Sequence, residues 1–596
     1  MTLATPVLRR GPLPAEKSGV RAQEPEPYRK PTKNRCVPSL FCKRQRAGAA
    51  PNSASGASGA HRRARGQTIL ALSVLLVLGI LGPGCQRQRV PSDELVVLIE
   101  QPPKNIDPRY ATTSYDLKLA FLCYTRLVSV DDDSLTPKLE LAEKVTVLPA
   151  DPAHPDQLRF EVKLRPARFA DGAEVTADDL VYTVERLADP KTGSPTLRRR
   201  FTESGMTLPP QIVDPHTVRF TLAHGQASFL TDLDFGIFRR GTAEPTTKRP
   251  SEGGMPIGAG PFVLVSDVGE VTRFVRNPNF YGGEPTLKRL TVRVIRDSNS
   301  RLLSLVGGSA DLTQNTVSPL LFDAIGKWHS RLQLETAPSA LLFYLGMNNE
   351  DMHLRDPRVR RALALAIDRE RIVRTKLHGK ATLASGLLAP LHWAYQAPQD
   401  PLSYDPAQAQ KLLDAAGFPD PDGPGPKPRF TLQYKTSTDA LPVAIARVIA
   451  AQLAEVGIAI ELRPLEFHLF LSDVKKGNFQ LYTLSSAEIA EPNLYRNFFH
   501  SAFIPTAANL DAGLNRMRYR NPELDVLLDQ GVREMNREKR RLIYARVQTI
   551  LARDLPMLPL WHPNNVVVAR RLVQGFRMWP SAQLSGLATV NKLPEP

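Results

Sequence analysis

Apolar and polar residues alternate in short runs along most of the chain, which predicts β-strands separated by helices. The clearest example is residues 158–164, LRFEVKL, where every second residue is apolar. An Asp-Gly turn at Gly172 follows, and the next residues carry an apolar stripe at helical spacing that stops before Pro190. Thr176 and Asp179 have the spacing of a capping box at the start of this helix. The segment predicts a strand, a turn and a helix whose polar residues have structural roles.

Two further stretches indicate the fold class. Residues 430–434 and 458–462 alternate as strands and flank a helix over residues 442–455, which is a β-α-β unit. Residues 262–265 and 271–276 predict a β-hairpin. These patterns predict an α/β protein.

The turn before this hairpin contains Gly258, Gly260 and Pro261. A dinucleotide-binding loop would need a third glycine and a following helix, whereas the chain continues here as a strand. We therefore interpret the glycines as a turn and not as a phosphate-binding loop.

Length and charge narrow the class of protein. With 596 residues the chain is too long for a single core and is expected to form two or three lobes. The formal net charge of +17 is unevenly spread, because residues 1–84 hold 14 Lys or Arg against 3 Asp or Glu, a net charge of +11. The remaining residues hold 63 basic against 57 acidic side chains, a net charge of +6. The basic character belongs mainly to the leader and does not indicate nucleic-acid binding by the folded part.

The leader has two parts. Residues 1–67 are rich in Arg, Pro, Gly, Ser and Ala without apolar periodicity, which predicts disorder, and a misplaced chain start is the alternative account. Residues 68–82 are apolar, uncharged and preceded by arginines, as in a secretory signal. Cys85 follows at once, an order that resembles a bacterial lipoprotein signal in which Cys85 is lipidated. An uncleaved membrane anchor and ordinary cleavage are the alternatives.

Neither the cysteines nor the remaining motifs indicate an enzyme. Cys36 and Cys42 lie in the leader, and Cys123 lies in an apolar run, so we expect a buried thiol and no internal disulfide. The folded part has no GxSxG, HExxH, CxxC or Walker motif, and its histidines lack metal-ligand spacing. We expect no catalytic residues, no metal site and no cofactor.

Four blocks of the chain carry a family resemblance. They are residues 158–190, 256–312, 343–386 and 404–418. In outline they contain LR…F.DG..VTADD..YT.ER..DP, GAGP…RNPNFYGGEP, DPRVRRALALAIDRERI and YDPAQAQKLLDAAGF. Together these blocks closely resemble the family 5 extracellular solute-binding proteins, the peptide- and nickel-type receptors of ABC importers.

The resemblance implies a two-lobed α/β fold of the type II periplasmic-binding-protein kind, enlarged by an accessory subdomain. Two hinge strands are expected near residues 341–347 and 558–568. The expected division of the chain is a disordered leader at 1–67, a signal at 68–85, lobe I at 86–135, 255–338 and 562–596, an accessory subdomain at 136–254, and lobe II at 339–561.

The resemblance also implies a function. We expect a periplasmic, lipid-anchored, monomeric protein that binds small peptides and delivers them to an ABC permease of two transmembrane subunits with ATPases. The same fold binding an oligosaccharide, a metal complex or a small cation is one alternative. A receptor or chaperone-like protein that works without a permease is another.

Peptide-type members of this family hold the ligand as an added strand, and a carboxylate in a "W.AD…P" segment meets its terminal amine. The matching stretch is residues 485–492, SSAEIAEP, which puts Glu488 at the carboxylate and Ser485 at the tryptophan. Glu488 is therefore the first ligand-binding candidate, and a solvated loop charge is the alternative. Further candidates by position, each with packing or exposure as the alternative, are Trp393, Tyr395, Tyr495, Arg496 and Trp561.

Overall fold

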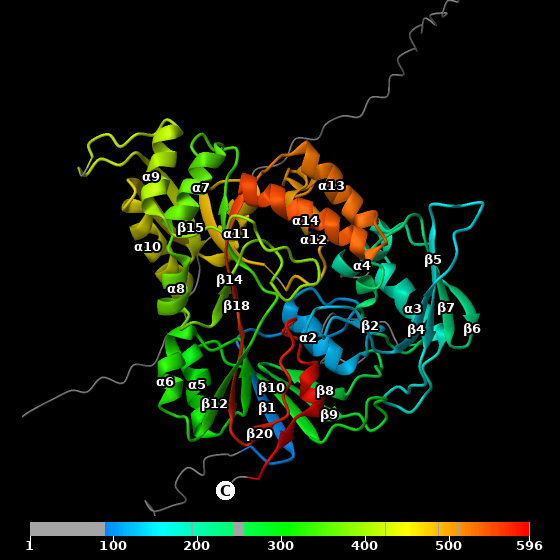
Figure 1. The fold of residues 1–596 in the computed structure, drawn as a ribbon. Helices are drawn as coiled ribbons and strands as arrows, with labels where there is room; N and C mark the ends of the chain where they lie inside the picture. Colours follow the sequence, from blue (N-terminus) through cyan, green and yellow to red (C-terminus); the bar gives the residue numbers. More distant parts are fainter. Residues whose placement is uncertain are drawn as a thin grey trace, which may run out of the picture. The chain divides into compact units, whose positions relative to one another are not determined.

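The fold comes from a computed structural model, shown in Figure 1. It describes residues 90–191, 195–241, 255–423, 425–486, 488–510 and 513–594. The predicted leader, the predicted signal and Cys85 lie outside these residues, so their assignments stay predictions.

The first lobe is built on a seven-stranded sheet. Its strands lie in the order β12 (Leu332–Ala337), β19 (Asn565–Arg570), β11 (Leu312–Gln314), β1 (Glu94–Ile99), β10 (Arg289–Val294), β9 (Val271–Arg276) and β8 (Phe262–Val268). Strand β1 is parallel to both of its neighbours, and β8 and β9 form the predicted hairpin. The helices of this lobe are α2 (Ser114–Cys123), α5 (Ser298–Gly307) and α6 (Phe322–Gly326).

The second lobe is built on a six-stranded sheet. Its strands lie in the order β14 (Ala381–Leu383), β18 (Met557–Pro563), β13 (Phe343–Met347), β17 (Leu481–Ser485), β15 (Phe430–Ser437) and β16 (Ile458–Leu465). The predicted β-α-β unit is confirmed, because β15 and β16 pair in parallel and are joined by α10 (Ala440–Ala454).

Helices cover both faces of the six-stranded sheet (Figure 1). One face packs against α10 and against α7 (Pro357–Ala366), α8 (Arg369–Lys376) and α9 (Pro406–Ala415). The other face packs against α11 (Phe467–Lys476), α12 (Leu494–Phe499), α13 (Pro522–Arg533) and α14 (Arg537–Asp554).

The described part of the chain passes twice between the seven-stranded and the six-stranded sheet. It leaves β12 of the first lobe and enters β13 of the second, and it returns from β18 to β19 across Asn564. The predicted two-lobed α/β fold with two connecting strands is therefore confirmed.

A four-stranded antiparallel sheet forms a third element. Its order is β4 (Ala142–Val147), β5 (Leu158–Leu164), β7 (Thr217–Leu222) and β6 (Gln211–Asp214), and α3 (Ala177–Ala188) packs on it beside α4 (Pro195–Glu203). The predicted capping box is present, since the Asp179 carboxylate accepts hydrogen bonds from the backbone N–H and the hydroxyl of Thr176, both at 2.9 Å. Two further strand pairs are β2 (Val128–Ser129) with β3 (Lys138–Leu139), and β20 (Val573–Gln574) with β21 (Asn591–Lys592).

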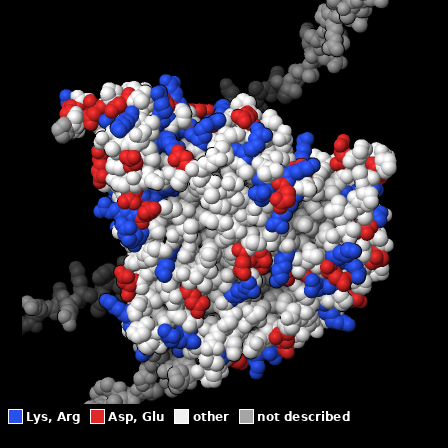
Figure 2. Space-filling view, viewed as in Figure 1, with Lys and Arg blue, Asp and Glu red and all other residues white. Residues whose placement is uncertain are grey.

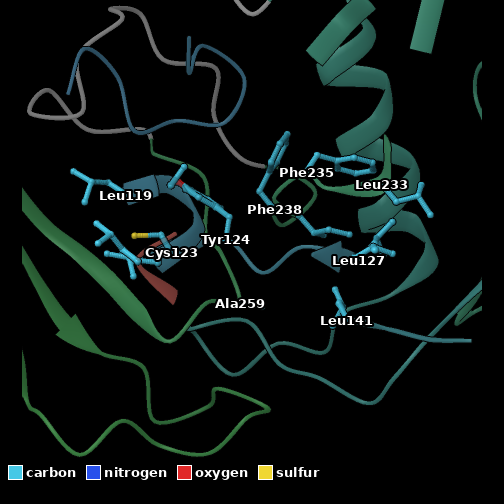
Figure 3. Packing of buried hydrophobic residues seen from close by; sticks show 14 of the residues in the cluster. Leu119, Cys123, Tyr124, Leu127, Leu141, Leu233, Phe235, Phe238 and Ala259 are labelled. Atoms are coloured by element: carbon cyan, nitrogen blue, oxygen red, sulfur yellow. The ribbon is translucent and has the colours of Figure 1, made fainter. Parts of the chain in front are cut away.

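The glycine turn before β8 packs against the end of α2. The N–H of Gly260 donates to the carbonyl of Cys123 at 2.8 Å, and a Cβ on Gly260 would lie 2.5 Å from the carbonyl carbon of that residue. Figure 3 shows Cys123 and Tyr124 among the buried side chains around Ala259. Cys123 is buried as expected, and burial raises the pKa of its thiol to about 12. The glycines therefore serve close packing, which confirms the structural interpretation.

The surface of the described residues carries charges of both signs. Basic and acidic side chains are interspersed over the face of the described residues shown in Figure 2. No helix among the described residues is long and apolar enough to span a membrane.

Candidate functional site

The carboxyl ends of parallel strands from both lobes lie near the two crossings. In the second lobe β15 and β17 run parallel, and residues 485–492 continue from the end of β17. In the first lobe β1 and β11 run parallel, and β11 ends beside Val567, three residues after the crossing at Asn564. Ligands of α/β proteins bind outside the carboxyl ends of parallel strands, so this is where a ligand site is expected.

Glu488 is held at this place by backbone hydrogen bonds on both sides. Ser486 N–H donates to the carbonyl of Leu342 at 2.8 Å, and Ile489 N–H donates to the carbonyl of Ala340 at 3.1 Å. These bonds tie the segment to the chain that crosses into β13. The backbone on either side of Glu488 is therefore fixed beside the hinge, and a ligand-binding role for Glu488 stays a prediction.

The Glu488 carboxylate meets a cation from the other lobe. Its Oε1 lies 3.5 Å from Nζ of Lys118 on α2, and the two side chains are only 21% and 13% exposed. Within the part of the chain that the structure describes, neither charged group makes another hydrogen bond. Nothing in the sequence pairs residues 370 positions apart, so sequence reasoning missed Lys118.

A second contact from the same segment runs through Glu491. Its carboxylate pairs with the buried Arg540 of α14 and accepts a hydrogen bond from Thr231 Oγ1 at 3.2 Å. Thr231 begins the 3-10 helix η1 (Thr231–Leu233), which follows the four-stranded sheet in the chain. Residues 485–492 thus contact two other parts of the protein, through Lys118 and through Thr231.

The charge of Glu491 acts on a neighbouring acid in η1. Burial raises the pKa of Asp232 to about 6, and the negative charge of Glu491 adds to this shift. Ser228 Oγ at 2.8 Å and the amide of Gln226 both donate to the Asp232 carboxylate and limit the rise. The positive charge of Arg200 also lowers the pKa of Asp232, but burial outweighs it.

Trp393 lies close to this segment, and Tyr395 lies two residues further along the chain. Trp393 is half-buried, and the guanidinium groups of Arg537 and Arg540 lie 4.9 and 5.5 Å from its ring centroid. Because Arg540 also binds Glu491, the structure brings Trp393 and residues 485–492 together. Tyr395 is half-buried with its hydroxyl 3.2 Å from Ser385 Oγ. A ligand-binding role for either residue stays a prediction.

The other three candidates point elsewhere. Tyr495 is buried against Tyr544, with ring centroids 5.9 Å apart, and burial raises the pKa of its hydroxyl. Arg496 donates through Nε to Asp529 at 2.7 Å. Trp561 is 1% exposed and lies in the core between the six-stranded sheet and its helices. In this structure Tyr495 and Trp561 are core residues and Arg496 is a partner of α13.

Trp561 nevertheless packs against Phe343, an aromatic residue near the site that sequence reasoning missed. Its ring stacks on Phe343 with centroids 5.6 Å apart and an angle of 6°. Phe343 is half-buried and pairs in the sheet with Ser485, which is exposed. Paired residues of neighbouring strands share one face of a sheet. Phe343 is therefore placed to supply part of the apolar wall that the family's tryptophan would form at Ser485.

Gln314 is a second side chain that sequence reasoning missed. It is the last residue of β11 and only 8% exposed, yet among the described residues neither its amide oxygen nor its amide nitrogen has a hydrogen-bond partner. Leaving a buried amide unpaired costs free energy, and such groups call for a bound water or ligand. Its place at a parallel strand end makes Gln314 a ligand-binding candidate from the first lobe.

The described residues contain no cluster of three or more His, Cys, Asp or Glu side chains arranged to hold a metal ion. They do contain an ion pair between the two lobes, at Glu488 and Lys118, and an unpaired buried amide at the end of β11, at Gln314. Each of the two lobes therefore offers polar groups near the strands that join them.

The fold and the site together define a two-lobed solute-binding protein. The chain belongs to the bacterial extracellular solute-binding proteins, family 5, because the model of that family's middle region matches residues 136–504. The protein therefore acts outside the cytoplasm.

Several characterised proteins are similar over most of the chain. The probable di/tripeptide-binding protein 5 of Pseudomonas aeruginosa is 27% identical over 517 residues, which cover 84% of this chain and 96% of that protein. The structure of the oligopeptide-binding protein AppA from Bacillus subtilis in complex with a nonapeptide is 24% identical, with a TM-score of 0.66 over 84% of this chain and 99% of that one. NikZ from Campylobacter jejuni in complex with Ni(L-His) is 22% identical, with a TM-score of 0.69 over 84% and 100% of the chains. The two structures share the fold.

Proposed function

We propose that this protein captures short peptides between its two lobes and delivers them to an ABC importer. The observation that carries the proposal is Glu488, a carboxylate fixed at the end of β17 that already holds an ammonium group from the other lobe. A peptide amino terminus presents the same group. The similarity to a probable di/tripeptide-binding protein and to a structure with a bound nonapeptide supports peptides as the ligand class.

In this proposal the peptide lies extended between the lobes with its amino terminus at Glu488. Gln314 offers one donor and one acceptor, which is the pair that a peptide group needs. Phe343 and Trp393 supply apolar surface for side chains. Groups from both lobes contact the ligand, so its binding favours the closed arrangement of the lobes.

The partners and the location complete the proposal. The outer faces of the two lobes dock on a permease of two transmembrane subunits with ATPases, and lipid on Cys85 anchors the monomer outside the cytoplasmic membrane. The lobe limits remain those expected from the sequence, with lobe I at 86–135, 255–338 and 562–596, the accessory subdomain at 136–254, and lobe II at 339–561. The ligand is released unchanged, because the protein acts without catalysis.

Calorimetry with di- to pentapeptides tests the proposal. The protein without residues 1–84 should release heat with peptides, and Glu488→Ala should weaken binding about tenfold or more, since a charge-assisted hydrogen bond is lost. Glu143→Ala is the matched control, because Glu143 pairs with Lys163 on the exposed four-stranded sheet and should leave affinity unchanged. Chromatography of the bound peptide should return it intact. Peptides that give no heat, while another solute does, would refute peptide binding.

A non-peptide solute is the second candidate. It is favoured by Ser485, which is exposed where the family's peptide receptors carry a large apolar tryptophan. A structural neighbour with Ni(L-His) shows that this fold also holds a metal complex. Mass spectrometry of material that copurifies with the protein separates the two candidates, because a peptide and a metal complex or sugar differ in mass and fragmentation.

A further inference from the structure

The ion pair between Glu488 and Lys118 brings a cation of the first lobe to the carboxylate proposed to bind the ligand. Lys118 is fixed on α2, whose first turn is closed by the capping box of Thr113 and Asp116. Tyr115 lies one turn earlier on the same face and donates its hydroxyl to Glu100 at 2.8 Å. The end of α2 is itself held by the glycine turn at Gly260. The lysine is thus presented to the second lobe from a rigid helix.

The pair is shielded from solvent to an extent that gives it energetic weight. The side chains of Lys118 and Glu488 are only 13% and 21% exposed. If the pair is broken, water can solvate each charge only in part, so each charge needs another partner. A ligand ammonium that binds Glu488 therefore competes with the Lys118 ammonium for one negative charge. Two cations then share one carboxylate, so an additional negative charge beside Lys118 stabilises the complex.

We propose that Lys118 is a specificity-determining residue which makes the site select peptides with an acidic first residue. The inference rests on the proposed function. In such a peptide the amino terminus binds Glu488 while the adjacent side-chain carboxylate binds Lys118, so both charges of the protein stay paired. With a neutral first residue Lys118 and the ligand ammonium share the single charge of Glu488, and a basic first residue adds repulsion.

The test compares two peptides of nearly equal shape, Glu-Ala-Ala and Gln-Ala-Ala, by calorimetry. The unchanged protein should bind the glutamate peptide about tenfold more tightly, which is the effect of one added charge pair. In Lys118→Met this preference should disappear, and Gln-Ala-Ala should bind about tenfold more tightly than it binds the unchanged protein, because the competing ammonium is gone. Lys118→Arg should keep the preference for the glutamate peptide.

Lys163→Met is the matched control, since Lys163 forms an exposed ion pair with Glu143 on the four-stranded sheet and should leave both affinities unchanged. Equal affinity of the unchanged protein for both peptides, or a preference that survives in Lys118→Met, overturns the inference and leaves peptide binding intact. If neither peptide nor any other short peptide binds the protein or its variants, the proposed function fails and the inference fails with it.

Discussion

Residues 158–190 and residues 485–492 differ in where their polar groups find partners. In the first segment Asp179 closes the capping box of its own helix, three residues from Thr176. In the second segment Glu488 meets Lys118, and Glu491 meets Thr231 and Arg540. Asp179 also accepts a hydrogen bond from the backbone N–H of Arg240 at 2.8 Å, and Thr183 donates to the carbonyl of Phe238 at 3.1 Å. The side chains of the first segment thus bind residues that, like the segment itself, precede the crossing from β12 to β13. Glu488 and Glu491 follow that crossing and bind Lys118 and Thr231, which precede it. Scaffold and binding site can be told apart by this difference.

The largest effect on stability is expected from a substitution in the core of the four-stranded sheet. Phe160 in β5 is buried and stacks on Phe220 with centroids 5.1 Å apart. Phe160→Ala should lower the free energy of unfolding by about 3–5 kcal/mol, because it opens a cavity in the core. Urea unfolding measures this loss, and peptide affinity of the folded protein should not change. Val147→Ala on the neighbouring strand is the control, since Val147 is half-exposed and should change stability by less than about 0.5 kcal/mol.

A change at Arg540 should affect stability and binding together. Arg540→Met leaves Glu491 without its cation and removes the donor to the carbonyl of Gly531 at 3.0 Å. The free energy of unfolding should fall by about 2–4 kcal/mol, and peptide affinity should fall because residues 485–492 lose an anchor. Arg541→Met tests the assignment, because Arg541 is half-exposed and pairs with Glu538 one turn away, so its loss should have little effect. Equal effects of the two substitutions would contradict the account.

Acid should weaken the attachment of residues 485–492 through His392. Its Nε2 lies 3.2 Å from the carbonyl of Ala490, its Nδ1 accepts from the N–H of Ala394 at 3.0 Å, and burial lowers its pKa to about 4. Between pH 6.5 and about 4 the folded protein binds fewer protons than the unfolded chain, so stability is lost as the pH falls through this window.

The loss from this group should amount to roughly 3 kcal/mol at pH 4. His392→Asn should be less stable than the unchanged protein at pH 7.5 and should lose less stability on acidification, as measured by urea unfolding at several pH values. His329→Asn, at an exposed position, should follow the unchanged protein. A pH profile that His392→Asn leaves unaltered would count against the assignment.

The smallest expected effect on stability belongs to Gln314. Gln314→Leu removes a buried amide that has no partner among the described residues, so the free energy of unfolding should stay equal or rise by about 1 kcal/mol. Peptide affinity should fall, because a donor and an acceptor are lost from the site. Calorimetry and urea unfolding on the same preparation measure both. Lower stability with unchanged affinity would show that Gln314 is an ordinary core residue.

The sequence predicted local structure well and the site only in outline. The capping box at Thr176, the β-α-β unit and the buried Cys123 follow from periodicity and short-range spacing, and the structure confirms them. Trp561 is a ligand-binding candidate by its position in the sequence, but in the structure its side chain packs in the core between the six-stranded sheet and its helices. The alternation of a strand does not reveal which of its two faces meets the core. Lys118 was missed because a contact between residues 370 positions apart leaves no local signal.

The most direct test of the central claim, that Glu488 binds the amino terminus of the ligand, compares Glu-Ala-Ala with its N-acetylated form. Calorimetry of the unchanged protein should show that acetylation weakens binding about tenfold or more, because it removes the ammonium that pairs with the carboxylate. In Glu488→Gln acetylation should change the affinity by less than about twofold. A loss on acetylation that is equally large in both proteins, or absent from the unchanged protein, would contradict the claim.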